Sequence, residues 1–186
     1  MAVTQPYVTL EAFWKAEETS ETRHEWLDGV VYDMSRGTPE HARLVAAISS
    51  ELTVALKGEC IVFGSDVMLY IADTRFTTYA DVSVVCGPLA THRVAKLGEA
   101  ITNPTLLVEV LSEKTEEYDR GEKFAHYMRI SSLQEYVLVS QHERRIEVFR
   151  RPERGHWIHE VAREGESLTL HGHPIQVDAV YAKPQL

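Results

Sequence analysis

The pattern of hydrophobic and polar positions in the first part of the chain predicts a helix followed by a hairpin. Residues 10–18 are mostly helix formers, and Thr9 before them is a suitable N-cap. In residues 23–35 (RHEWLDGVVYDMS), Asp28 and Gly29 stand between two alternating runs. An Asp-Gly pair in that setting is a strong signal for a tight β-hairpin turn.

A longer helix and a series of short strands are predicted next. Apolar residues recur every four positions within residues 39–57, with Thr38 as N-cap, Pro39 in the first turn and Gly58 after the last turn. Residues 87–103 lack a clear period and are predicted to form a loop that includes a short helical piece. Compact apolar runs predict strands at residues 60–63, 67–71, 78–85 and 105–111.

The rest of the chain is predicted to contain one more helix, over residues 115–128, and then only strands. Turns are expected at Arg154-Gly155 and Glu164-Gly165, between runs that alternate in the manner of antiparallel strands. The predicted strands are residues 135–139, 145–150, 156–162, 167–170 and 175–181.

One charged residue stands in a segment that should carry none. Glu109 interrupts the apolar run 105–112 (TLLVEVLS), which reads as a strand buried on both faces. The period of two places Leu107 and Leu111 on its face of the sheet. A lone buried carboxylate is costly unless it is paired or binds a metal. Glu109 is therefore expected either to bind a cation or to form a buried ion pair with an arginine or with Lys123.

A second acidic residue supports the metal interpretation. Asp81 opens another β-branched run, 78–85 (TYADVSVV), without a turn that would explain it. If the two strands are neighbours, Asp81, Glu109 and the backbone carbonyl of Val110 offer three oxygen ligands. Such a set suits a hard cation such as Mg²⁺ or Mn²⁺. For Asp81 alone, a loop-capping role is an equal alternative.

Metal-assisted phosphodiester cleavage also needs a group that orients the attacking water or stabilises charge on the phosphorus. Asp119, Lys123 and Tyr127 share one face of the predicted helix 115–128. Lys123 is the candidate for that role. The alternative is an ordinary surface salt bridge between Asp119 and Lys123, with Tyr127 as a core residue.

Composition narrows the class of protein. A chain of 186 residues with 44% hydrophobic and 25% charged residues is ordinary for one globular domain. No apolar segment approaches the length of a membrane helix. Cys60 and Cys86 lack a metal-binding spacing and are expected to be buried free thiols in the cytoplasm. The net charge of −9 opposes bulk coating of nucleic acid but leaves room for one local site.

Taken together, these motifs resemble a known family. Residues 107–139, together with 23–35, His41 and the run Tyr79-Ala80-Asp81-Val82, closely resemble the putative restriction-endonuclease-like family of the PD-(D/E)XK nuclease superfamily. The resemblance covers nearly the whole chain. It implies an α/β (α+β) fold in which a mixed sheet is flanked by helices, with β-hairpins added to this core at both ends. It also implies that Asp81 and Glu109 are the metal-binding acids of a DNA phosphodiesterase.

The chain departs from the superfamily pattern at two positions. Ala80 stands where proline is usual, which affects no chemistry, and Leu111 stands where the motif lysine belongs. Lys123 is expected to supply the missing amine from the following helix. Lys114 is the rival, although it falls in a segment expected to be an exposed loop.

Several other polar residues are weaker candidates for a functional site. Glu25 and His41 occur where the family has the same residue types, and with Tyr127 they could complete or support the metal site; a cross-strand pair and a helix-turn residue are equally good explanations. Zinc is only weakly indicated by His156, His159, His171 and His173, since a fourfold ligand set is missing. The clustering of arginines on one predicted hairpin is best explained by a solvated edge hairpin. These arginines are at positions 144, 145, 150, 151 and 154.

The sequence thus predicts one restriction-endonuclease-like domain over residues 1–186: an N-terminal helix and hairpin (1–37), a core (38–140) and a C-terminal β extension (141–186). The predicted activity is Mg²⁺- or Mn²⁺-dependent endonucleolytic cleavage of DNA by a cytoplasmic protein, with a homodimer expected from family analogy and no membrane partner. The alternative is a non-catalytic nucleic-acid-binding or assembly module that keeps the nuclease fold. The acidic balance and Leu111 favour the alternative, whereas the retained Asp81, Glu109 and Lys123 oppose it.

Overall fold

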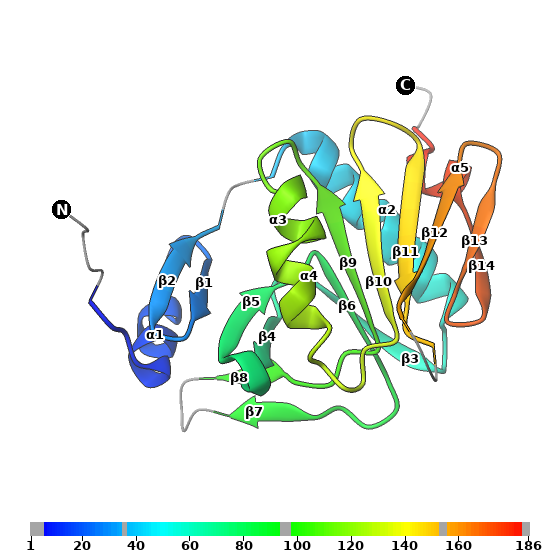
Figure 1. Ribbon diagram of the computed structural model, residues 1–186. Helices are drawn as coiled ribbons and strands as arrows, with labels where there is room; N and C mark the ends of the chain where they lie inside the picture. Colours follow the sequence, from blue (N-terminus) through cyan, green and yellow to red (C-terminus); the bar gives the residue numbers. More distant parts are fainter. Residues whose placement is uncertain (1–5, 35–36, 94–97, 153–155, 184–186) are drawn as a thin grey trace.

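A mixed six-stranded sheet forms the centre of the molecule (Figure 1). The computed structural model describes residues 6–34, 37–93, 98–152 and 156–183. Within them the central sheet has the strand order β12-β11-β10-β9-β6-β3. β9 and β10 are parallel, and the other neighbours are antiparallel. Its strands are β3 (Cys60–Gly64), β6 (Val82–Cys86), β9 (Leu106–Leu111), β10 (Glu135–Ser140), β11 (Arg145–Arg150) and β12 (Ile158–Arg163).

A second six-stranded sheet and a small hairpin complete the β structure. The second sheet has the order β2-β1-β5-β4-β8-β7, and a 3₁₀ turn (Ala72–Thr74) joins β4 to β5. The hairpin pairs β13 (Ser167–Leu170) with β14 (His173–Gln176). The strands of the second sheet are β1 (His24–Leu27), β2 (Val30–Asp33), β4 (Met68–Ile71), β5 (Phe76–Tyr79), β7 (Thr91–Arg93) and β8 (Glu99–Ile101).

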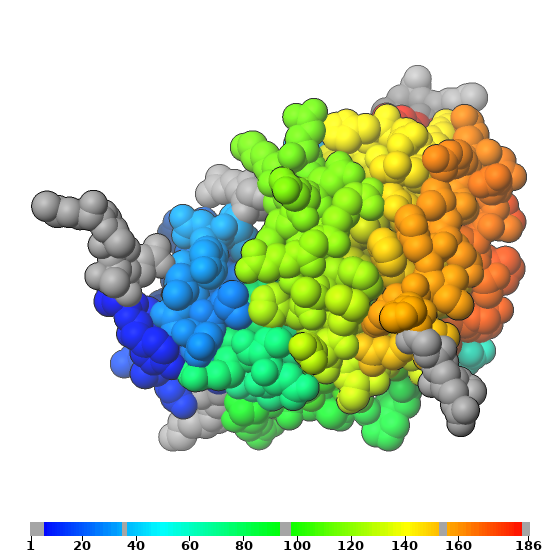
Figure 2. Space-filling model, viewed as in Figure 1, coloured from blue at the N-terminus to red at the C-terminus, as the bar shows by residue number. Residues whose placement is uncertain are grey.

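Helices cover both faces of the central sheet. On one face lie α2 (Pro39–Ala55) and α5 (Val177–Tyr181), and on the other lie α3 (Glu116–Arg120) and α4 (Glu122–Tyr127). α1 (Leu10–Glu17) packs on the second sheet. In Figure 2 the yellow-green atoms of α3 and α4 cover the central sheet and meet the blue N-terminal hairpin. A mixed sheet flanked by helices is therefore confirmed.

Strand β9 divides its side chains between the two cores as its alternation predicts. Val108 and Val110 pack in the core under α2. Leu107 and Leu111 pack in the core under α4. Glu109 shares the second face, so its carboxylate points towards α4, where the candidate lysine lies.

The early elements form where local sequence signals place them. Thr9 caps α1 by accepting a hydrogen bond from the Ala12 N–H, and Thr38 caps α2 in the same way. Asp28 and Gly29 adopt φ angles of 41° and 97° between β1 and β2. The predicted hairpin and both predicted helices are therefore confirmed, apart from Ser35, which lies outside the described residues.

One predicted strand is in fact two strands in different sheets. Residues 78–85 were expected to be continuous, but β5 ends at Tyr79 in the second sheet and β6 begins at Val82 in the central sheet. The chain crosses between the sheets at Ala80 and Asp81. Hydrophobic alternation does not detect such a crossing, because both halves are buried and β-branched.

Three other predicted elements need correction. The described residues of 87–103, which are 87–93 and 98–103, contain β7 and β8 and no helix. The helix over 115–128 is broken into α3 and α4 at Gly121, where ψ is −92°. Residues 175–181 form the end of β14 followed by α5, not one strand. These segments are short, so a few tertiary contacts outweigh their local preferences. The turn at Glu164-Gly165 is confirmed, with φ of 80° at Gly165, while Arg154-Gly155 lies outside the described residues.

The cysteine prediction is wrong in the structure. Cys60 on β3 and Cys86 on β6 stand directly opposite each other and form a disulfide. The two runs that carry them are antiparallel neighbours, a pairing that their spacing in the sequence does not reveal. Among the described helices, none is both long and apolar enough to cross a membrane.

The arginines in and beside β11 form salt bridges with acidic side chains and hydrogen bonds with backbone carbonyls, as expected for a solvated hairpin. Arg144 pairs with Glu164, Arg145 with Glu143 and Glu147, and Arg150 with Glu135. Arg151 donates to three backbone carbonyls; Arg154 lies outside the described residues. The described arginines of this region thus have partners within the protein.

A second polar network ties α3 to the same strand. Glu147 accepts hydrogen bonds from Arg120 at 2.6 and 3.0 Å, and it lies 2.8 Å from a His159 ring nitrogen and 3.3 Å from Arg145 Nε. Burial acts to raise the pKa of Glu147, but these hydrogen bonds outweigh it and hold the pKa below its usual value.

Candidate active site

Asp81 lies where the chain crosses from one sheet to the other, and its carboxylate is fixed by two partners. Oδ2 accepts a hydrogen bond from the backbone N–H of Val110 at 2.7 Å. The same oxygen is 3.1 Å from Nε2 of His41, in the first turn of α2. No hydrogen bond from a described residue reaches Oδ1. The predicted neighbours Asp81 and Val110 are therefore in direct contact.

Glu109 is buried and has two partners from α4. Its Oε1 accepts a hydrogen bond from the Tyr127 hydroxyl at 2.8 Å and lies 3.0 Å from Lys123 Nζ. Only 5% of Glu109 is exposed. The buried ion pair considered from the sequence thus exists, and it joins two of the predicted catalytic residues.

Lys123 lies at the centre of a cluster of carboxylates. Its Nζ is 3.3 Å from Glu25 and 3.8 Å from Asp119, in addition to Glu109, and it donates a hydrogen bond to the Tyr79 carbonyl at 3.2 Å. Lys123 is 3% exposed. The surface salt bridge proposed as an alternative is therefore wrong, since the Asp119–Lys123 contact lies inside the molecule.

Glu25 belongs to the same cluster and is fixed by hydroxyl groups. Oε1 accepts a hydrogen bond from Thr78, and Oε2 accepts one from Tyr118 at 2.8 Å. Glu25 pairs with Tyr32 across the hairpin backbone, but its side chain faces the cluster. The cross-strand explanation thus gives way to a position beside Lys123.

Burial and charge set the protonation of the cluster. Desolvation raises the pKa of Glu109, and the Lys123 ammonium beside it opposes that shift by favouring the charged carboxylate. Desolvation also opposes the charge on Lys123, but Glu109, Glu25 and Asp119 together raise its pKa well above the usual value. Lys123 therefore keeps its proton at neutral pH.

The contact between His41 and Asp81 also affects protonation. The hydrogen bond to Asp81 raises the pKa of His41 despite partial burial. The imidazole holds the carboxylate in place by this hydrogen bond, and the carboxylate in turn favours the charged form of the ring.

The donor set fits a hard divalent cation. Asp81 and Glu109 supply carboxylate oxygens, and they are close enough for the charge of Asp81 to raise the pKa of Glu109. The N–H and C=O of one strand residue project to the same edge of that strand, so the Val110 carbonyl faces the side on which Asp81 lies. Among the described residues, no three histidine, cysteine or acidic side chains at this site bring ligand atoms within 4.8 Å of one another. The candidate centre thus depends on the backbone carbonyl and on water as further ligands.

The rival lysine lies elsewhere. Lys114 is exposed in the turn after β9. Three cluster members, Thr78, Tyr118 and Asp119, were not assigned to the site from the sequence. Only Asp119 had a usable signal, its spacing of four residues from Lys123. Thr78 on β5 and Tyr118 on α3 join the cluster because both elements meet Glu25 on β1.

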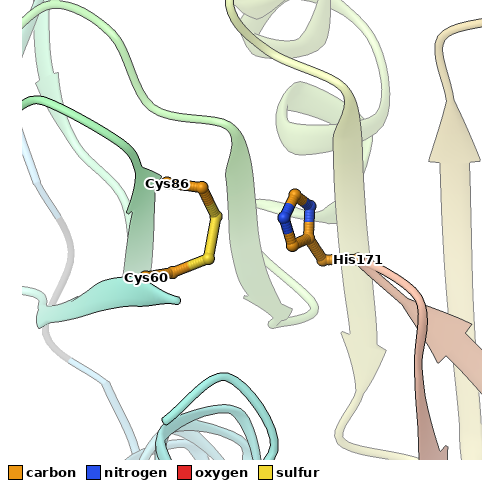
Figure 3. A group of neighbouring side chains, drawn as sticks. All are labelled: Cys60, Cys86 and His171. Atoms are coloured by element: carbon orange, nitrogen blue, oxygen red, sulfur yellow. A yellow bond between two sulfur atoms is a disulfide. The ribbon is translucent and has the colours of Figure 1, made fainter. Parts of the chain in front are cut away.

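The four histidines mentioned for zinc do not come together. His159 contacts Glu147, and His173 lies 3.3 Å from Glu59. His171 instead lies beside Cys60 and Cys86 (Figure 3).

Comparison with known proteins decides the family. A family model for Uma2, described as "Putative restriction endonuclease", matches residues 7–179. The chain belongs to the Uma2 family. The resemblance recognised from the motifs is thereby confirmed, and it extends over nearly all of the described residues.

Two relatives of this Uma2 protein come from Synechocystis sp. "Uncharacterized protein slr1290" is 35% identical over 179 residues, covering 95% of this chain and 92% of the relative. "Uncharacterized protein sll1609" is 28% identical over 159 residues, covering 85% and 89%. A similar solved structure is that of a putative nuclease belonging to DUF820 from Anabaena variabilis. Its TM-score is 0.73 at 16% identity, with 94% of this chain and 97% of that chain covered. The Uma2 chain therefore has the fold of a nuclease-like protein.

Proposed function

We propose that this Uma2 protein is a divalent-metal-dependent endonuclease that hydrolyses DNA phosphodiester bonds. The observation that carries the proposal is the convergence of Asp81, Glu109 and Lys123, residues from three separate parts of the chain. Asp81 contacts the Val110 backbone, and Lys123 contacts the Glu109 side chain on the same strand. If the Lys123–Glu109 ion pair served only to stabilise the fold, a second carboxylate, Asp81, would not be needed beside the same strand.

Asp81, Glu109 and the Val110 carbonyl would hold Mg²⁺ or Mn²⁺. A cation bound there supplies Lewis-acid chemistry: it polarises the phosphate and lowers the pKa of a coordinated water. His41 holds Asp81 in position, and Tyr127 holds Glu109. These two residues therefore orient the ligands rather than touch the substrate.

Lys123 acts in this proposal as a cation and hydrogen-bond donor, not as a base. Its pKa lies well above the usual value, so it does not accept a proton from water at neutral pH. A protonated amine next to Glu109 can orient the attacking water and stabilise the negative charge that develops on the phosphate oxygens. Leu111 at the usual lysine position is compatible with this role, since α4 supplies the amine from the same face of β9.

Other features of the proposal stay predictions. DNA as the substrate and a homodimer that cuts both strands come from family analogy, one domain over residues 1–186 comes from the chain length, and a cytoplasmic location was predicted from two free thiols. The Cys60–Cys86 disulfide is unusual for a reducing cytoplasm.

A plasmid-nicking assay tests the activity. Supercoiled DNA is incubated with the purified protein and Mg²⁺, Mn²⁺ or a chelator, and the relaxed and linear products are measured. We expect cleavage with a divalent cation and a loss of at least about 100-fold in Asp81→Asn, Glu109→Gln and Lys123→Met. Lys114→Met is the matched control and should keep full activity. Cleavage that survives in Asp81→Asn would contradict the proposal.

A non-catalytic binding module is the second candidate, and one observation favours it. Lys123 contacts Glu109, Glu25 and the Tyr79 carbonyl, so its three donors already have partners inside the protein. If this candidate is correct, no cation supports cleavage, while DNA binding measured by fluorescence anisotropy is the same in Lys123→Met and the unchanged protein.

A further inference from the structure

A second group of potential metal ligands lies at the far end of strand β6. Cys60, Cys86 and His171 bring their sulfur and ring nitrogen atoms within 4.8 Å of one another (Figure 3). Asp81 precedes the first residue of β6 and Cys86 is its last residue. Five residue steps along a strand span about 16 Å, so this group is separate from the candidate active site.

The three residues come from three different elements that the fold holds together. Cys60 and Cys86 are cross-strand partners in β3 and β6, and β3 is an edge strand of the central sheet. His171 lies in the two-residue turn between β13 and β14. All three side chains are partly exposed, so a reductant or a metal ion from solvent can reach them.

Hydrogen bonds fix the surroundings of this group. The backbone N–H of His171 donates to Glu135 Oε2 at 2.9 Å, which anchors the turn to β10. The Thr105 hydroxyl lies 3.2 Å from Cys86 Sγ and 3.1 Å from the Val84 carbonyl oxygen, and it can donate its single proton to either atom. A hydroxyl donor at that distance stabilises a thiolate, the form of cysteine that binds metals.

We propose that Cys60, Cys86 and His171 form a redox-controlled site for a soft divalent metal, Zn²⁺ in the first instance. In the oxidised protein the two sulfur atoms share a disulfide and cannot both act as thiolate ligands. A dithiol reductant gives two electrons and two protons to the disulfide and itself becomes a disulfide. The metal then displaces the two thiol protons to solvent and binds two thiolates and one imidazole nitrogen, with water as the fourth ligand.

The geometry and the donor chemistry agree with this assignment. Around tetrahedral zinc, with Zn–S of about 2.3 Å and Zn–N of about 2.0 Å, neighbouring ligand atoms lie about 3.5–4 Å apart. Once the disulfide is reduced, the two sulfur atoms must move apart to reach that separation, whereas the His171 ring nitrogen already lies within 4.8 Å of both. Thiolate and imidazole ligands select zinc over Mg²⁺. The site is therefore chemically distinct from the oxygen ligands of Asp81 and Glu109, and it does not depend on the proposed nuclease activity.

The turn offers a variant that removes the imidazole without disturbing the fold. His171 and Gly172 both adopt positive φ, 46° and 84°, and asparagine followed by glycine is preferred in such two-residue hairpin turns. His171→Asn is therefore compatible with the backbone. His173→Asn, two residues away and beside Glu59, is the matched control.

Zinc content measured after reduction tests the proposal. The full chain carrying Asp81→Asn and Glu109→Gln, to remove the other site, is reduced with a phosphine, loaded with Zn²⁺ and dialysed without oxygen. We expect one zinc ion per chain by mass spectrometry in the reduced protein and none in the disulfide form. His171→Asn should bind zinc at least about tenfold more weakly, and His173→Asn should bind it normally.

Cobalt provides a second readout that does not rely on affinity. Co²⁺ bound to the reduced protein should show thiolate-to-cobalt charge-transfer absorption, which Cys60→Ser weakens and peroxide abolishes. The proposal is overturned if the reduced chain holds no more zinc than the oxidised chain, or if His171→Asn retains zinc as well as His173→Asn does.

Discussion

Lys123→Met should strongly reduce the stability of the protein. The ammonium lies within 4 Å of Glu109, Glu25 and Asp119 in a site almost without solvent. Methionine fills a similar volume but leaves these carboxylates without their common cation. Removing one partner of a buried ion pair costs about 3–5 kcal/mol. With a urea dependence of about 2 kcal/mol per molar, the unfolding midpoint should fall by about 1.5–2.5 M.

Urea unfolding followed by circular dichroism, with a chelator present, measures this shift. Lys114→Met is the control, and because Lys114 is exposed its free energy of unfolding should change by no more than about 0.5 kcal/mol. Adding Glu109→Gln to Lys123→Met should recover part of the loss, with a coupling energy of at least about 1 kcal/mol. Equal midpoints for the Lys123 and Lys114 variants would refute the description of a charge cluster that depends on its lysine.

Three further predictions concern single interactions. Tyr127→Phe removes a hydrogen bond to buried Glu109 and should lower the free energy of unfolding by about 1.5–3 kcal/mol, measured in the same titration; an unchanged value would show that the hydroxyl is not needed. Because the folded pKa of Glu147 is depressed, its contribution is present above pH 4.5 and is lost as the pH falls below that value. The stability advantage over Glu147→Gln should therefore shrink between pH 6 and pH 3, and a constant advantage would be evidence against the Glu147 network. Reducing the Cys60–Cys86 disulfide, which closes a loop with a sequence separation of 26, should cost about 3.5 kcal/mol in the absence of metal; no loss of thermal stability on reduction would contradict this.

Sequence patterns predicted the long, regular elements of the fold well. α2 combines a threonine cap, a proline in the first turn, a four-residue repeat and a terminal glycine, and it forms within two residues of its predicted end. The alternation along β9 placed Glu109 on the face that meets α4. In both segments, local preference and burial favour the same structure.

Prediction failed where tertiary contacts decide the structure. The crossing between sheets at Ala80 and Asp81, the break at Gly121 and the helix at residues 177–181 leave no periodic signal in such short segments. The disulfide depends on β3 and β6 being neighbours, which neither run reveals alone.

The candidate site likewise contains residues that the sequence could reveal and residues that only tertiary contacts bring together. Asp81, Glu109 and Lys123 stood out because each is a charge in an unexpected or suggestively spaced position. Tyr118 had no such signal, because its contact with Glu25 depends on α3 lying against the N-terminal hairpin. Glu25 and His41 were ambiguous in the sequence, and the structure places both against predicted site residues.

The most direct test of the proposed metal centre is a crystal of the protein soaked in Mn²⁺ and measured for anomalous scattering. This measurement requires no knowledge of the DNA target. We expect an anomalous peak about 2.0–2.6 Å from oxygens of Asp81, Glu109 and the Val110 carbonyl, with the Lys123 amine nearby. Absence of a peak there at saturating Mn²⁺ would contradict the metal-dependent nuclease and favour the non-catalytic binding module.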